Sequence, residues 1–133
     1  MKRFDWVRRM YDTIDAIQGE PFAWGKNDCC LFSARVVDAM CDTDFADQLR
    51  QEYQDERTAL LYIASFGSIP KALEYWLGKP QPLIYAQRGD VMVFDNLGQE
   101  TVGISVGDSI VSTGYTGLVR VSKELALHSW AIR

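Results

Sequence analysis

The hydrophobic pattern of this chain changes its period between Gly78 and Pro82. Up to Gly78, apolar residues recur at the spacing of amphipathic helices. Beyond Pro82, they alternate with polar residues or run together, and many of them are β-branched, as in strands. Helical segments followed by strand segments form separate layers in a domain. The pattern therefore predicts an α+β fold, in which N-terminal helices pack on a C-terminal antiparallel β-sheet meander.

The first half of the chain contains the start and stop signals of four helices. The predicted helices are residues 4–18, 29–41, 56–65 and 70–77. Between the second and the third, residues 42–54 are mostly polar and are expected to form a short connecting helix or a loop. Phe45, Leu49 and Tyr53 are its inward anchors.

Five strands are expected in the second half, because β-branched runs are separated there by turn residues. The predicted strands are residues 90–94, 101–107, 109–114, 117–121 and 129–133. A short SKELAL segment lies between the last two.

The length and charge of the chain exclude several classes of protein. Its 133 residues fit one domain, 1–133, with no internal repeat. The formal net charge of −4 argues against nucleic-acid binding, which needs clustered Lys and Arg. The N-terminal segment lacks the apolar run of a secretory signal, and no stretch reaches the length of a membrane span. We therefore expect a protein made in the cytoplasm without a signal peptide, with neither nucleic acid nor membrane as a partner.

The three cysteines, Cys29, Cys30 and Cys41, do not form a disulfide framework. Two of them are adjacent, and a bridge between neighbours is strained. Zinc sites need paired ligands, whereas the only histidine, His128, is far from the cysteines along the chain. We therefore expect reduced thiols, no metal and no cofactor, which leaves cysteine chemistry or binding as the function.

Cys29 has the position that a reactive thiol requires. Asn27 or Asp28 is placed to cap the helix that begins at Cys29. The amides and partial positive charge of a helix N-terminus lower the pKa of a thiol there and favour the nucleophilic thiolate. The alternative is a buried, inert cysteine on the apolar face of the helix, a common state of free thiols. Cys30 is expected to fill a packing gap.

Several short motifs resemble the signature of the NlpC/P60 cysteine peptidases, which have a papain fold. FAWG at residues 22–25, followed by NDC at 27–29, resembles the Trp-Gly turn and Asp-Cys-Ser-Gly of that family. QRGDVMVF at 87–94 resembles its Gly-Asp-Leu-Val-Phe-Phe strand. TVGI at 101–104, with Gly107 after it, lies where the family has His-Val-Gly-Ile and a glycine. The resemblance implies an NlpC/P60-like papain fold with Cys29 as the nucleophile.

The chain is more similar still to short phage proteins of unknown function that are encoded among tail genes. The shared features are the WGxNDC opening and a late Gly-Tyr-x-Gly-Leu, which here comprises Gly114, Tyr115, Gly117 and Leu118. This resemblance implies a tail-associated bacteriophage protein that is incorporated in the particle.

The family pattern fails at the residues that would assist the thiol. A papain-like thiol needs an imidazole within hydrogen-bonding reach, held by a third polar group. Here the corresponding positions hold Thr101 and Thr113, and a threonine hydroxyl is not a base near neutral pH. His128 would serve as base only if the last strand passed beside the helix of Cys29. Otherwise it is a partly exposed histidine near a strand end.

The aromatic residues near the motif fit a binding role. Trp24 precedes Cys29 in the same loop, and Tyr115 lies in a loop that should approach the same end of the fold. Together they would wall a groove, although such aromatics are often core residues. The candidate binding residues are Trp24, Asp28, Thr101, Thr113 and Tyr115.

Three functions remain open. The first is a catalytically degenerate NlpC/P60-like protein that acts in binding or tail assembly, with a protein or a cell-wall peptide as its partner. The second is an active cysteine hydrolase or acyltransferase, in which Cys29 attacks and His128 is the base. The third is an inhibitor that binds a host protein. The acidic net charge is the only feature that supports it.

Overall fold

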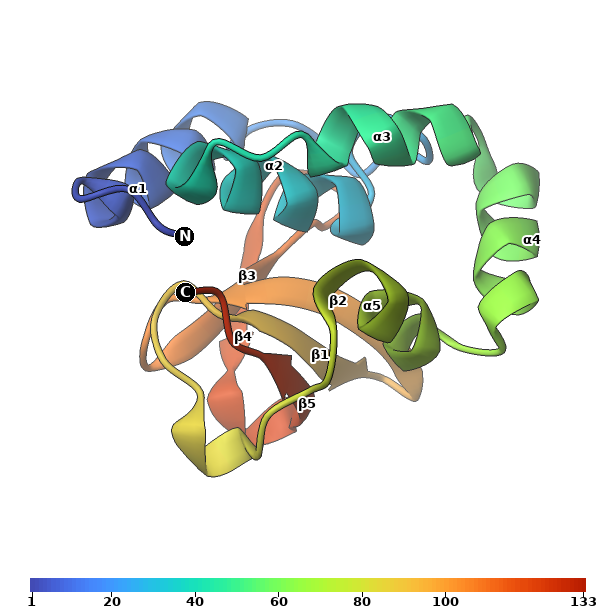
Figure 1. The fold of residues 1–133 in the computed structure, drawn as a ribbon. Helices are drawn as coiled ribbons and strands as arrows, with labels where there is room; N and C mark the ends of the chain where they lie inside the picture. Colours follow the sequence, from blue (N-terminus) through green and yellow to red (C-terminus); the bar gives the residue numbers. More distant parts are fainter.

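The computed structural model describes residues 1–133 and has the predicted order, with helices first and a sheet after them (Figure 1). The helices are α1 (Trp6–Ile17), α2 (Cys29–Cys41), α3 (Phe45–Glu52), α4 (Glu56–Phe66) and α5 (Ile69–Leu77). The strands are β1 (Val91–Asn96), β2 (Gln99–Ser105), β3 (Ser109–Ser112), β4 (Val119–Ser122) and β5 (Ala126–Trp130). Two short 3₁₀ helices, η1 (Leu83–Tyr85) and η2 (Lys123–Leu125), precede β1 and β5. The α+β prediction is confirmed.

Several helices start where a side chain accepts the first free amides of the helix. Asp28 accepts from the Leu31 amide at 2.9 Å and begins α2 at Cys29, as predicted. Asp55 and Thr58 form a reciprocal capping box at the start of α4. None of the helices has the length and apolar content that a membrane span requires.

The helices form a layer that covers one face of the sheet. Figure 1 shows α1 and α2 side by side above the strands, with α3 continuing in the direction of α2. The chain then turns down through α4 at the side of the molecule and returns through α5 beside the sheet (Figure 1). This path leaves α4 the most peripheral of the five helices, and Ala59 is its only fully buried residue.

The sheet is entirely antiparallel, but it is not the simple meander that was expected. Its strand order is β4-β3-β2-β1-β5, so β1 to β4 form a meander and β5 crosses to the opposite edge to pair with β1. Two contacts hold this crossover. Gln81 pairs with Ser129, and the fully buried Asp90 accepts from the Ile132 amide at 3.1 Å. Alternation along a strand does not specify which edge the strand joins, because that choice depends on contacts distant in sequence.

The last strand also begins and ends earlier than expected, at Ala126 and Trp130 rather than at residues 129 and 133. The chain leaves the strand after Trp130, because Ile132 and Arg133 turn toward Asp90. The SKELAL segment is divided between the end of β4, η2 and the first half of β5. His128 therefore lies inside the strand rather than before it.

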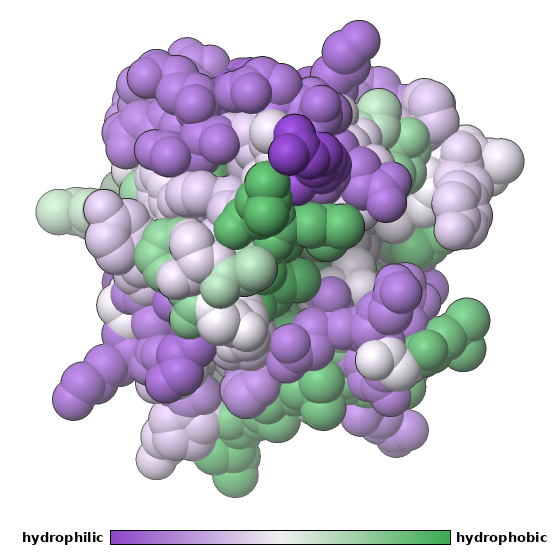
Figure 2. Space-filling view, turned by 90° about the vertical axis from the view of Figure 1, so that its right-hand side faces the viewer, coloured by the Kyte–Doolittle hydropathy of each residue, from purple (hydrophilic) through white to green (hydrophobic).

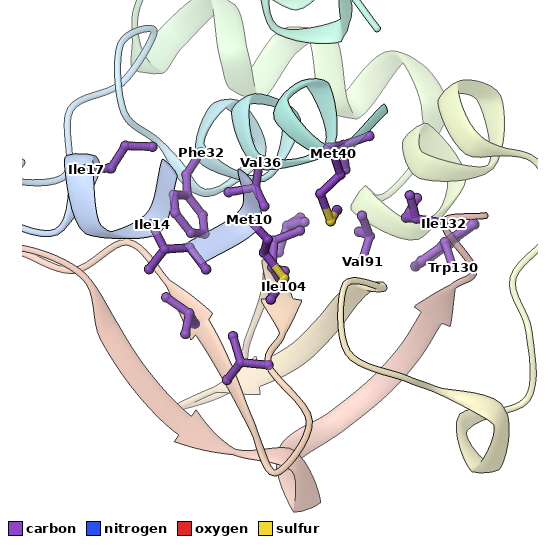
Figure 3. Packing of buried hydrophobic residues seen from close by; sticks show 14 of the residues in the cluster. Met10, Ile14, Ile17, Phe32, Val36, Met40, Val91, Ile104, Trp130 and Ile132 are labelled. Atoms are coloured by element: carbon purple, nitrogen blue, oxygen red, sulfur yellow. The ribbon is translucent and has the colours of Figure 1, made fainter. Parts of the chain in front are cut away.

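The main core lies between the helix layer and the sheet (Figure 3). Its members from the helices include Met10, Ile14 and Ile17 of α1 and Phe32, Val36 and Met40 of α2. Its members from the strands include Val91, Val93, Val102, Ile104, Val111 and Trp130. A second cluster, formed by Leu31, Leu49, Tyr53 and Ala59, joins α2 to α3 and α4. Met92, Phe94 and Ile110 form a third cluster on the other face of the sheet.

Candidate functional site

The loop before α2 is held by the buried carboxylate of Asp28, which is 1% exposed. Besides the Leu31 amide, Asp28 accepts from the Gly25 amide at 3.0 Å and from the Tyr53 hydroxyl at 2.9 Å. The backbone of Gly25 has a φ of +77°, which favours glycine, and an added Cβ would lie 2.2 Å from the Gln54 carbonyl oxygen. Asp28, a predicted binding residue, is therefore inaccessible and acts as a cap.

Cys29 is the first residue of α2 and is partly buried. Three donors lower the pKa of its thiol: first the Cys30 thiol, then the Val102 amide, then the Cys30 amide. Burial and the neighbouring Asp28 carboxylate act in the opposite direction. The pKa of Cys30 is raised, first because its thiol donates to Cys29 and then because it is buried. Of the two thiols, Cys29 is therefore the one that ionises at the lower pH.

The Val102 amide is available to Cys29 because the pairing between β2 and β3 ends before Val102. The two strands pair only at Ile104 with Val111 and at Ser105 with Ile110. Farther along β2, the Ser112 hydroxyl donates to the Val102 carbonyl oxygen at 2.6 Å. The Cys29 thiol receives the amide of the same residue. The start of α2 is thus docked in the fork between β2 and β3.

Thr101 and Thr113 differ in their relation to this fork. Thr101 is the neighbour of Val102 in β2, and strand alternation places it on the face of the sheet opposite to α2. Its hydroxyl lies 3.4 Å from the Gln99 carbonyl oxygen. Thr113 directly follows Ser112 at the fork, is 9% exposed and has no hydrogen-bond partner for its hydroxyl. The structure therefore brings Thr113 to the fork that holds Cys29, whereas Thr101, although next to Val102, lies on the other face of the sheet.

His128 is separated from Cys29 by a strand. It pairs with Val93 of β1, and Val93 pairs in turn with Val102 of β2. Two strand spacings place the backbones of His128 and Val102 roughly 10 Å apart. The His128 ring packs instead near Trp130, with 6.1 Å between ring centroids. The last strand does not pass beside the start of α2, so the predicted base is not brought to the thiol.

The loops of Trp24 and Tyr115 meet near the start of α2, as expected. The Phe22 amide donates to the Gly114 carbonyl oxygen at 2.9 Å, which joins the two loops. Trp24 is partly buried and packs edge-on against Phe22, with 5.0 Å between ring centroids. Tyr115 is 94% exposed. Trp24 therefore packs against the second core cluster, whereas Tyr115 projects into solvent.

Comparison with known proteins identifies the family. A family model described as a domain of unknown function (DUF6950) matches residues 1–132. The chain belongs to the DUF6950 family. No curated protein matches it.

Asp90 and Asp95 of this DUF6950 chain have structural roles. The Asp90 carboxylate accepts from the Gln87 amide and from the Gln81 and Arg133 side chains, in addition to Ile132. Asp95 accepts from the Gly98 amide at 2.7 Å in the turn between β1 and β2. No cluster of three His, Cys, Asp or Glu side chains has the arrangement of a metal site.

Two features of the DUF6950 site were missed by sequence analysis. Tyr53 was expected only as an apolar anchor, but its hydroxyl binds Asp28 under the start of α2. Cys30 was expected only as a filler, but its thiol is the leading donor to Cys29. The adjacency of the two cysteines was the only signal of the second feature. No signal indicates the Val102 amide, because a backbone group has no signature in a sequence.

Proposed function

We propose that this DUF6950 chain is a phage-type protein with an NlpC/P60-like papain fold that no longer catalyses hydrolysis and acts in binding or tail assembly. The observation that carries the proposal is the strand order, which separates the strand of His128 from the strand that Cys29 meets. Cys29 meets β2, and β1 lies between β2 and the strand of His128. A papain-like reaction needs a base in hydrogen-bonding reach of the thiol to take and return its proton.

Several features support the papain-like part of the proposal. A helix with a cysteine as its first residue packs by that end against the second strand of an antiparallel sheet. Motif segment 101–104 falls on β2, which packs against that helix, and segment 87–94 leads into the neighbouring strand β1. The phage and tail parts rest on the WGxNDC opening and the late Gly-Tyr-x-Gly-Leu.

Tyr115 is the residue best placed to contact a protein or cell-wall peptide partner. Its ring is almost fully exposed, and its loop is fixed at both ends. The Leu118 amide donates to the Gln18 carbonyl oxygen at 3.0 Å, and Gly114 accepts from Phe22. An exposed aromatic ring on a fixed loop loses little conformational entropy when it is buried by a partner.

The loss of catalysis is tested with purified peptidoglycan. The wild-type protein and Cys29→Ser are incubated with it, and released peptides are measured by mass spectrometry beside an active hydrolase. We expect no release from either protein. Release by the wild type that is lost in Cys29→Ser would overturn the proposal.

The binding role is tested by co-purification with tail proteins expressed together with the chain. We expect Tyr115→Ala to weaken a tail-protein complex by about tenfold or more, as for a central aromatic contact. Tyr85→Ala is the matched control, because Tyr85 is also exposed but lies on η1. Equal effects of the two substitutions, or the absence of the chain from purified particles, would contradict a tail role.

A cysteine hydrolase is the second candidate, and one observation favours it. The donors from Cys30 and Val102 lower the pKa of Cys29, as a nucleophilic thiol requires. In that case the base would have to come from water or from the substrate rather than from His128. Hydrolysis that survives in His128→Ala but not in Cys29→Ser would identify this mechanism.

A further inference from the structure

An apolar pocket lies between the helices and the sheet, next to the thiol pair. It is lined by α2, α3, α4 and α5 and by Val91 and Val102 of the sheet. Its cavity volume is about 70 Å³. An apolar cavity of roughly 150 Å³ holds a benzene ring. A single small ring therefore fits here only when the outer wall of the pocket moves outward.

Ser33 is the single polar residue among the 16 that line the pocket; the other 15 are hydrophobic. It is 3% exposed, and its hydroxyl has no hydrogen-bond partner. A serine within a helix commonly donates to the carbonyl oxygen one turn earlier, but the Ser33 hydroxyl has no such bond. Burying an unpaired hydroxyl is unfavourable. This hydroxyl therefore lacks the partner that a bound molecule would supply.

The other hydroxyl groups in the lining are already engaged. The Tyr53 hydroxyl donates to Asp28. The Tyr62 hydroxyl accepts from the Trp76 indole nitrogen at 3.0 Å. A buried water needs two to four polar partners, and Ser33 has the only hydroxyl in the lining without any hydrogen bond. A water molecule is therefore a poor occupant, and a ligand would direct its one polar atom to Ser33.

The chemistry of the walls defines the ligand further. Four aromatic rings, those of Phe45, Tyr53, Tyr62 and Trp76, contribute to the lining. No charged side chain lines the pocket, and burying an unpaired charge there would be costly. A flat, neutral ring packs well in a narrow space between aromatic side chains. A small aromatic molecule with a single hydroxyl or N–H group satisfies all of these conditions.

The outer wall of the pocket is able to adjust to a ligand. Only Ala59 of α4 and Ala72 of α5 are fully buried, so these helices have few buried contacts with the rest of the molecule. Figure 2 faces this side and shows apolar side chains gathered among hydrophilic ones. Leu60 and Leu61 of α4 are 51% and 57% exposed. The entry of a ring requires an outward shift of α4 and α5.

From these observations, we propose that this pocket binds a small neutral aromatic molecule of the phenol or indole class, with its polar group on the Ser33 hydroxyl. The proposal does not depend on the function proposed above, because it involves neither the reactivity of Cys29 nor the Tyr115 loop. It assigns to the helix layer a binding site of its own.

The test compares phenol with toluene, which lacks the hydroxyl, by titration of the isotope-labelled full chain in NMR. We expect saturable shifts at Leu73 and Trp76 with both probes, and tighter binding of phenol. Ser33→Ala should weaken phenol binding roughly three- to tenfold and leave toluene binding unchanged, because one hydrogen bond is lost. The ratio of the two affinities is the readout, since it is insensitive to a general loosening of the pocket.

Ser129→Ala is the matched control, because Ser129 is also fully buried but lies on β5 and not in the lining. It should leave the affinity ratio unchanged. Ala34→Leu, which fills part of the pocket, should weaken both probes. The absence of saturable shifts, shifts confined to outer residues such as Gln48 and Gln51, or an unchanged ratio in Ser33→Ala would overturn the proposal.

Discussion

The Tyr53 hydroxyl donates to the Asp28 carboxylate at 2.9 Å, across 25 residues of sequence. This bond ties the end of α3 to the cap of α2, and both residues are almost fully buried. The carboxylate otherwise has only backbone donors, from Gly25 and Leu31. The first turn of α2, and with it the position of Cys29, is therefore fixed by a residue from the next helix.

Tyr53→Phe removes this donor without removing the ring. We expect the free energy of unfolding to fall by about 2 kcal/mol, because a buried carboxylate loses a hydrogen bond. Urea denaturation measures the change. Tyr115→Phe is the control, since Tyr115 is 94% exposed, and it should change the stability by less than about 0.5 kcal/mol. Equal stabilities of the two variants would show that the bond contributes nothing.

The pH dependence of alkylation tests the environment of Cys29. Because its pKa is lowered, the thiolate forms at lower pH than in a free cysteine, and the alkylation rate should rise with a midpoint below about 8.5. Cys30→Ala removes the leading donor and should move this midpoint upward. The rate is followed by mass spectrometry of the peptide that contains Cys29.

His128→Ala is the control for this experiment. Since β1 lies between the strand of His128 and β2, the substitution should leave the midpoint unchanged. A shift in His128→Ala would mean that the imidazole reaches the thiol. In that case the proposal that the protein is catalytically degenerate would be wrong.

Gly25→Ala should be far more disruptive than Gly67→Ala. Both glycines have positive φ, +77° and +102°, so each alanine is strained by roughly 1–2 kcal/mol. At Gly25 the new Cβ would also lie 2.2 Å from the Gln54 carbonyl oxygen, whereas no atom lies within 4 Å at Gly67. We expect a loss of about 3 kcal/mol or more at Gly25. Thermal unfolding of both variants measures the difference, and similar losses would show that the loop moves freely.

Arg133→Ala tests the contact that holds the C-terminal residues. The Arg133 guanidinium lies 2.7 Å from the Asp90 carboxylate, which is fully buried. We expect a loss of about 1–3 kcal/mol in chemical denaturation. Arg50→Ala breaks an ion pair of similar length, 2.8 Å, with the exposed Asp47, and should cost less than about 1 kcal/mol. A loss at Arg133 no greater than that at Arg50 would show that the three other donors to Asp90 suffice.

Local sequence signals were sufficient to predict much of the fold. The cap at Asp28 and the apolar spacing after it predicted α2 with the bounds that it has, Cys29–Cys41. The strand positions also followed from alternation, apart from the last. That strand was misplaced because its position depends on β1 and on Asp90, more than 30 residues earlier in the chain.

The candidate site was less predictable than the fold. The position of Cys29 at a helix start was predicted correctly, because it depends on neighbouring residues alone. The relation of His128 to Cys29 depends on strand order, which alternation does not specify. The Ser33 pocket arises where four helices and the sheet fail to fill space between them, and no local pattern encodes a packing defect.

The fork between β2 and β3 changes how substitutions of Cys29 must be interpreted. The thiol there accepts the Val102 amide, which has no strand partner at that position. Cys29→Ala would leave this amide unpaired, so it would weaken the protein even if the thiol has no chemical role. A phenotype of Cys29→Ala in a phage would therefore be no proof of enzymatic activity. Serine, which still offers an oxygen to the amide, separates the scaffold role of this side chain from its reactivity.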